Sequence, residues 1–167
     1  MAEEILPVGV IVDKKKSASP WIDHLWVPSA VVTGLPDAAP MTLVAKSGAD
    51  ESYFAGAANL VFASGDTGQY LENLVTGTPL IWIAVRAEEH DSYVTVVSVT
   101  ADPSEGESLT DSGSNIVQPV PMPPDIAARL AAFVDQHHVE REFFKRKRDR
   151  TDPEALGYRR PNRRDGS

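Results

Sequence analysis

The sequence of 167 residues contains no cysteine. This absence excludes disulfides, thiolate catalysis, iron–sulfur ligation and cysteine-based zinc sites, and it agrees with a reducing compartment. No stretch approaches the roughly 18 consecutive apolar residues of a membrane span. The first residues are acidic where a signal peptide would be basic. We therefore expect a cytoplasmic protein without membrane insertion.

Patterns that would indicate catalysis or metal binding are also missing. Only four histidines occur, and His137 and His138 are adjacent, so on a helix they would point about 100° apart, a poor geometry for sharing one ion. The carboxylate clusters lie in hydrophilic turns rather than in a pattern that predicts a cleft. The Gly65–Gly68 segment matches neither a P-loop nor a dinucleotide fingerprint. We predict no catalytic residue, no metal site and no cofactor, and hence a protein that is not an enzyme.

Charge is distributed unevenly along the chain. Residues 1–140 hold 6 Lys and Arg against 19 Asp and Glu, whereas residues 141–167 hold 10 against 5. An acidic body with a basic end suggests that the end has its own task. We therefore divide the chain into a single domain, residues 1–140, and a basic, aromatic-bearing C-terminal tail, residues 141–167.

Two runs rich in β-branched and aromatic residues, Leu80–Val85 and Tyr93–Val99, flank the polar tip Arg86–Ser92. They predict a central hairpin. The first run is apolar throughout, so we expect it at the sheet centre, with Trp82 in the core. Shorter expected strands are Pro7–Val12, which the charged cluster Asp13–Lys16 would end, Trp21–Val32, Met41–Ala45, Tyr53–Phe54, Asn59–Phe62 and Ile116–Val120. Pro28 favours an edge or a bulge in its strand.

Three helices are expected. Asp66 and Gln69 form a capping-box pattern ahead of the first, and Asp102-Pro103 begins a short second one. The longest, Pro123–Val139, carries an apolar stripe at helical spacing. Together these elements predict an α+β fold: a mostly antiparallel, bent sheet or partial barrel with two short helices, one longer C-terminal helix and the basic tail.

The partner-binding candidates are aromatic and basic. Trp21 and Trp26 flank a polar stretch. We favour core packing for them; the alternative is that one is exposed, where tryptophan often anchors an interface. In the tail, two adjacent aromatics precede a basic run. The tail candidates are Phe143, Phe144, Lys145, Arg146, Lys147, Arg148, Arg150 and Tyr158. Such a segment could wrap a protein partner or bind nucleic acid. Because the acidic body would repel a polyphosphate, we favour the protein partner.

Landmarks along nearly the whole chain resemble one family. They are Ser19-Pro20-Trp21, His24-x-Trp26-x-Pro28, Tyr53–Gly56, Gly77-Thr78-Pro79, Thr100–Pro103, Asp111–Gly113, Pro121–Pro124, His137–Val139, Phe144–Arg150 and Asp152–Gly157. In this order they are similar to the proteobacterial domain of unknown function 3305. Members of that family tend to be encoded beside molybdenum- or tungsten-dependent formate dehydrogenase subunits.

The resemblance implies an accessory, assembly or structural role near a formate dehydrogenase or its maturation machinery. It supplies no catalytic residue. One alternative is a small-ligand-binding barrel, which would show a deep apolar pocket lined by Trp21 or Trp26. Another is a nucleic-acid-binding protein, whose affinity would fall steeply with salt. The oligomeric state is left open.

Overall fold

The computed structural model describes residues 2–21, 23–34 and 37–151, with side chains described as far as His138. Its elements are β1 (Glu3–Lys16), β2 (His24–Val32), β3 (Thr42–Ser47), β4 (Asp50–Ala63), η1 (Ser64–Asp66), α1 (Thr67–Val75), β5 (Leu80–Glu88), β6 (Tyr93–Thr100), α2 (Pro103–Asp111), β7 (Ile116–Pro121) and α3 (Pro124–Thr151). The described strands form two antiparallel sheets, with the orders β2-β1-β4-β3 and β6-β5-β7. This architecture confirms the predicted α+β class.

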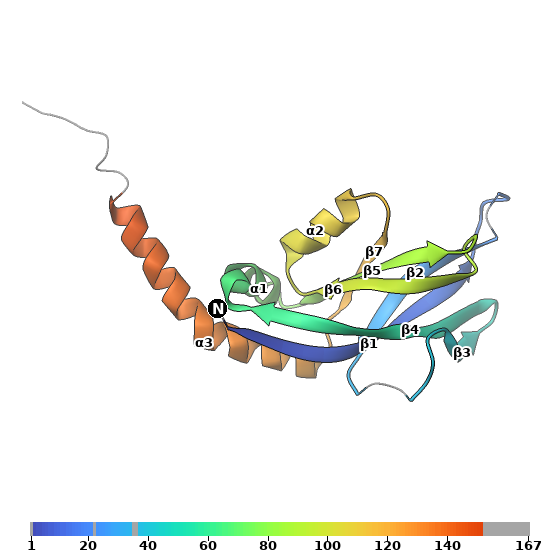
Figure 1. Cartoon of the computed structure of the whole chain (residues 1–167), viewed down its shortest axis with the longest axis horizontal. Coiled ribbons are helices and arrows are strands. Elements are labelled where there is room, and N and C mark those ends of the chain that lie inside the picture. Colours follow the sequence, from blue (N-terminus) through green and yellow to red (C-terminus); the bar gives the residue numbers. More distant parts are fainter. Residues whose placement is uncertain (1, 22, 35–36, 152–167) are drawn as a thin grey trace, which may run out of the picture.

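The two sheets enclose one interior. Strand β4 lies beside β6, and β2 lies beside β7, although neither pair is joined in a hydrogen-bonded ladder (Figure 1). The sheets therefore approach a barrel without closing it. The interior is filled by side chains from both sheets, among them the fully buried Val8, Val10, Leu60, Ile81 and Ile83. Complete burial of such side chains contributes about 1.5–3 kcal/mol each.

Helices α1 and α3 close one end of this interior. Ile126 and Leu130 of α3 are fully buried in the shared core, and Phe133 packs against Phe62 and Tyr70 at ring-centroid distances of 5.8 and 6.4 Å. The opposite end is formed by strand ends and hairpins (Figure 1). We call it the helix-free end: the end of β1, the start of β2, the β3–β4 turn and the β5–β6 tip.

Strand β1 is longer than the sequence predicts. It continues through Lys14, Lys15 and Lys16, which pair with Trp26, Leu25 and His24 of β2. The expectation that the Asp13–Lys16 cluster ends the strand is wrong, because ladder pairing on β2 outweighs the weak strand preference of lysine. The three lysines are thereby carried to the helix-free end.

Strands β2 and β4 also differ from their expected bounds. β2 begins at His24, so Trp21 lies in the preceding turn. The bulge expected at Pro28 is confirmed: the β1–β2 register shifts between Ile11 and Val12, which leaves Ser29 unpaired beside the proline. β4 is one strand rather than two, because the chain passes through Gly56 in an extended conformation with positive φ, 144°.

The central hairpin is present as β5 and β6, and β5 is the middle strand of its sheet, as predicted. The prediction that Trp82 is a core residue is wrong. Its side chain is only partly buried and lies outside the core between the sheets. Alternation along the strand points Ile81 and Ile83 inward and Trp82 to the outer face.

The two predicted helix caps have different outcomes. Asp102 caps α2, since its carboxylate accepts hydrogen bonds from the N–H groups of Ser104 (2.8 Å) and Glu105 (3.3 Å). Asp66 stands at the N-cap of α1 but makes no side-chain capping hydrogen bond there, because the chain enters through the 3-10 turn η1. The predicted capping box at Asp66 is therefore wrong.

Helix α3 runs twelve residues past its expected end at Val139 and crosses the predicted domain boundary at residue 140. Its 28 residues span about 42 Å at 1.5 Å per residue. Among the described residues, no helix is both long and apolar enough to cross a membrane.

Candidate functional site

Seven of the eight predicted tail residues lie on the last turns of α3. Positions 143–148 and 150 are helical, and Figure 1 shows this part of α3 extending beyond the body. Their side chains, and Tyr158 altogether, lie outside the described structure. The last buried residue described on α3 is Val134, and His137 and His138 make its last described side-chain contacts, with Phe133 and with Thr67 (3.2 Å). The backbone thus presents the aromatic and basic segment on a projecting helix.

The two tryptophan candidates differ in their exposure to solvent. Trp21 is 90% exposed, in the turn between β1 and β2, whereas Trp26 is 5% exposed. The core packing favoured from the sequence is therefore present at Trp26 and wrong at Trp21, which the turn before β2 leaves in solvent. Trp21 remains a candidate for partner contact, while the ring of Trp26 is occupied within the body by Tyr53, at a ring-centroid distance of 5.8 Å.

The β5–β6 tip is locked onto β2 at the helix-free end. The main-chain oxygen of Asp91 accepts hydrogen bonds from His24 Nε2 (2.8 Å) and Trp26 Nε1 (2.9 Å). Glu89, His90 and Asp91 all have positive φ, 46°, 58° and 66°. Such backbone costs about 1–3 kcal/mol per residue and persists where surrounding contacts hold it. The two hydrogen bonds from β2 provide that restraint.

A pocket of about 380 Å³ lies at the helix-free end. It is lined by Lys14, Lys15, Lys16, Asp23, His24, Ala49 and Glu51. Sequence reasoning missed this site because it took the three lysines for the end of a strand. The available signal was the concentration of charge: four of the six basic residues of the segment 1–140 are Lys14–Lys16 and Lys46.

Glu51, one of the two carboxylates of this pocket, is already engaged. Its Oε1 accepts a hydrogen bond from Tyr53 Oη (2.6 Å), and its Oε2 lies 3.9 Å from Lys46 Nζ. The hydrogen bond to Glu51 raises the pKa of Tyr53, and burial raises it further. Tyr53 therefore stays protonated and acts as a donor.

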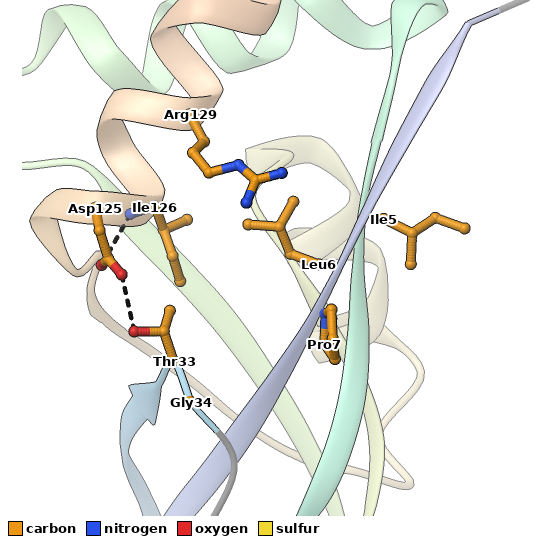
Figure 2. A pocket seen from close by; sticks show the side chains of 8 residues that line it. All are labelled: Ile5, Leu6, Pro7, Thr33, Gly34, Asp125, Ile126 and Arg129. Carbon is orange, nitrogen blue, oxygen red and sulfur yellow. Dashed lines mark hydrogen bonds between the residues drawn. The ribbon is translucent and has the colours of Figure 1, made fainter.

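A second pocket, of about 220 Å³, lies where α3 begins (Figure 2). Its polar groups are paired within the chain. Asp125 accepts a hydrogen bond from Thr33 Oγ1 (2.8 Å), and Arg129 forms an ion pair with Glu4, with its Nε 2.8 Å from Glu4 Oε2. These contacts join the start of α3 to the end of β2 and the start of β1. We assign this pocket a structural task, which is to fix the direction of α3.

A third pocket, of about 330 Å³, lies between α1 and α2 on the outer face of β5. One of its polar residues, Asn73, is 4% exposed, and both its amide nitrogen and its amide oxygen form hydrogen bonds within the chain. The Asn73 side chain donates to the carbonyl oxygens of Leu80 (2.8 Å) and Ala101 (3.0 Å) and accepts from the Leu80 N–H (2.9 Å). It fastens α1 to the first residue of β5 and to the end of β6.

The histidines do not converge. His24 packs edge-on against Trp26 at a ring-centroid distance of 5.3 Å, and His90 is exposed on the β5–β6 tip. Within the described part of the chain, no three His, Asp or Glu side chains are close enough together to hold a metal ion.

Comparison with known proteins gives one match. The model of a family described as "Protein of unknown function (DUF3305)" matches residues 7–148, which include both sheets except the first four residues of β1, and all but the last turn of α3. No curated protein and no solved structure matches the chain.

Proposed function

The chain belongs to the DUF3305 family of proteins of unknown function, and we propose that it is a non-enzymatic accessory protein that binds a protein partner through the projecting end of α3. The observation that carries this proposal is the course of α3. Its last described buried residue is Val134, and its backbone continues to Thr151 and extends beyond the body (Figure 1). Residues 139–151 of this helix span about 20 Å at 1.5 Å per residue.

The sequence of this projecting segment suits a protein interface. It carries Phe143 and Phe144 followed by the basic run Lys145–Arg148. Burial of two phenylalanine side chains contributes several kcal/mol, at about 1.5–3 kcal/mol each. The basic run would steer an acidic partner surface and increase the association rate more than the affinity. Helical preorganisation lowers the entropy lost on binding.

The finer part of the proposal names the partner as a formate dehydrogenase or its maturation machinery. This part rests on the family resemblance and not on the geometry. A protein located beside such an enzyme in the cytoplasm would use α3 as a docking arm and the two-sheet body as a rigid base.

The test is affinity purification of the tagged protein from its own host with three chains: full length, residues 1–140, and full length with Phe143→Ala and Phe144→Ala. We expect formate dehydrogenase subunits or their maturation factors with the full chain only. The matched control is Leu71→Ala with Val75→Ala, which removes two exposed apolar side chains from α1. Recovery of the same partner by residues 1–140 would place the interface on the body and contradict the proposal.

A nuclease-treated sample distinguishes the nucleic-acid alternative. If recovery of the partner depends on nucleic acid, and if binding to DNA or RNA weakens steeply between 50 and 200 mM salt as phosphate contacts predict, the basic run binds polyphosphate rather than protein.

A further inference from the structure

The three lysines of the helix-free pocket have no anionic partner in the described structure. No carboxylate oxygen lies within 4 Å of the ammonium groups of Lys14, Lys15 or Lys16, although acidic residues outnumber basic ones in the segment 1–140. The contrast with the pocket at the start of α3 is clear, because there Arg129 is paired with Glu4. The helix-free pocket therefore holds uncompensated positive charge.

Lys14 is the least solvated of the three. It follows Leu6, Val8, Val10 and Val12 on the inward row of β1 and is partly buried. Its Nζ lies 5.8 Å from the ring centroid of Trp26. A cation–π contact of this kind orients the ammonium group but satisfies none of its three N–H donors. A partly buried ammonium group with free donors, directed to a pocket, is suited to an anion.

The carboxylates of the pocket do not neutralise these lysines. Glu51 is held by Tyr53 and Lys46, and the side chain of Asp23 is exposed. Three ammonium groups thus face two carboxylates, of which one is already bonded elsewhere. The balance of charge at the pocket is positive, whereas residues 1–140 as a whole carry 13 more acidic than basic residues.

His24 adds a ring held in a fixed position. A carbonyl oxygen only accepts, so His24 Nε2 carries the proton that it donates to Asp91. His24 also lines the pocket, and its second ring nitrogen is Nδ1. The hydrogen bond depends on the three consecutive positive-φ residues of the tip. Strained backbone of this kind is concentrated at ligand sites and switch regions. Here it fixes one wall of the lysine pocket.

From these observations we infer that the helix-free pocket binds a small ligand bearing an oxyanion group, either phosphate or carboxylate, between Lys14, Lys16 and His24. The volume of about 380 Å³ exceeds that of a single phosphate and falls in the usual range for small-molecule pockets. The site lies at the end opposite to α3 (Figure 1), so it is separate from the proposed partner interface.

The test is calorimetric and NMR titration of the full-length protein with pyrophosphate and with citrate, at constant ionic strength maintained with sodium chloride. We expect saturable 1:1 binding of at least one of the two anions, with shifts of the Trp26 indole N–H resonance. Pyrophosphate binding alone assigns the site to phosphate, and citrate binding alone to carboxylate. Lys14→Gln should raise the Kd of the bound anion at least tenfold.

The matched control is Arg86→Gln, which removes one positive charge from β5, outside the pocket lining. It should change Kd less than twofold. Lys16→Gln, at an exposed position, gives a second test if Lys14→Gln impairs folding. Absence of saturable binding by both anions, or equal weakening by Arg86→Gln and the lysine variants, would overturn the inference, since the second result indicates diffuse attraction rather than a site.

Discussion

The indole ring of Trp82 in β5 lies directly against Gly106 in α2. A Cβ placed on Gly106 would come within 2.4 Å of Trp82 Cγ, and two further ring atoms would lie within 2.7 Å. The absence of a side chain at this helical position therefore allows α2 to lie on the outer face of the smaller sheet. Trp82, which the sequence predicts in the core, instead packs against α2 on the outer face of β5.

This contact predicts opposite effects for two Gly→Ala substitutions. Gly106→Ala forces the Trp82 ring aside, and overpacking costs about 1–3 kcal/mol, more than the roughly 1 kcal/mol gained from helix propensity. Gly68→Ala, in α1 with open space around its Cβ, should leave stability unchanged or raise it by up to about 1 kcal/mol. Urea melts measure both, and destabilisation by Gly68→Ala equal to that by Gly106→Ala would contradict the contact.

Asn73 should be among the most sensitive polar positions. Asn73→Leu leaves the Leu80 N–H and two carbonyl oxygens without their partner, and each unsatisfied buried group costs about 1–3 kcal/mol. We expect a loss of at least about 2 kcal/mol and faster hydrogen exchange at the Leu80 amide. The control is Asn59→Leu, at an exposed position on β4, which should change stability by less than about 0.5 kcal/mol.

Tyr70 predicts a loss of stability at high pH. Burial raises the pKa of Tyr70 to about 12, despite the opposing hydrogen bond from the Ala63 N–H. Between pH 10 and about pH 12 the unfolded chain loses the phenolic proton while the folded chain retains it, so the free energy of unfolding falls as pH rises. Below pH 10 the group contributes no slope. Denaturant melts at several pH values should show a smaller decline for Tyr70→Phe than for the wild type.

The two tryptophans near the helix-free end should differ in their effect on stability. Trp26→Ala removes a buried ring and one of the two donors to the Asp91 carbonyl oxygen, with an expected cost of about 3–5 kcal/mol. Trp21→Ala, at a side chain that is 90% exposed, should cost less than about 0.5 kcal/mol. Thermal or urea unfolding checks both values, and similar losses for the two variants would show that Trp21 packs against the body in solution.

Replacement of Lys145–Arg148 by glutamine should affect the kinetics of partner binding. We expect a lower association rate and a weaker dependence of that rate on salt, with little change in the dissociation rate, because the basic run acts by steering. Surface plasmon resonance at two salt concentrations measures these quantities. A change confined to the dissociation rate would assign direct contacts to the basic run.

The sequence alone determined the local elements whose signal lies in neighbouring residues. Alternation and β-branched composition predicted the β5–β6 hairpin, Asp102-Pro103 predicted the start of α2, and Pro28 predicted a bulge. The apolar stripe of α3 predicted its buried face, with Ile126, Leu130, Phe133 and Val134 all in the core. Each of these features depends on interactions within a few residues or on a simple period of apolar residues. A short window of the sequence is therefore enough to predict it.

Only the tertiary structure decided the features that depend on distant partners. Lys14–Lys16 join a strand because β2 pairs with all three and β4 pairs with Lys14, and Trp82 packs against α2 because Gly106, 24 positions later, has no side chain. The helix-free pocket brings together the ends of β1, β2 and β4, whose residues are separated by up to 37 positions. Local propensities do not predict these contacts between distant residues, since the contacts arise from the way in which two bent sheets pack around one core.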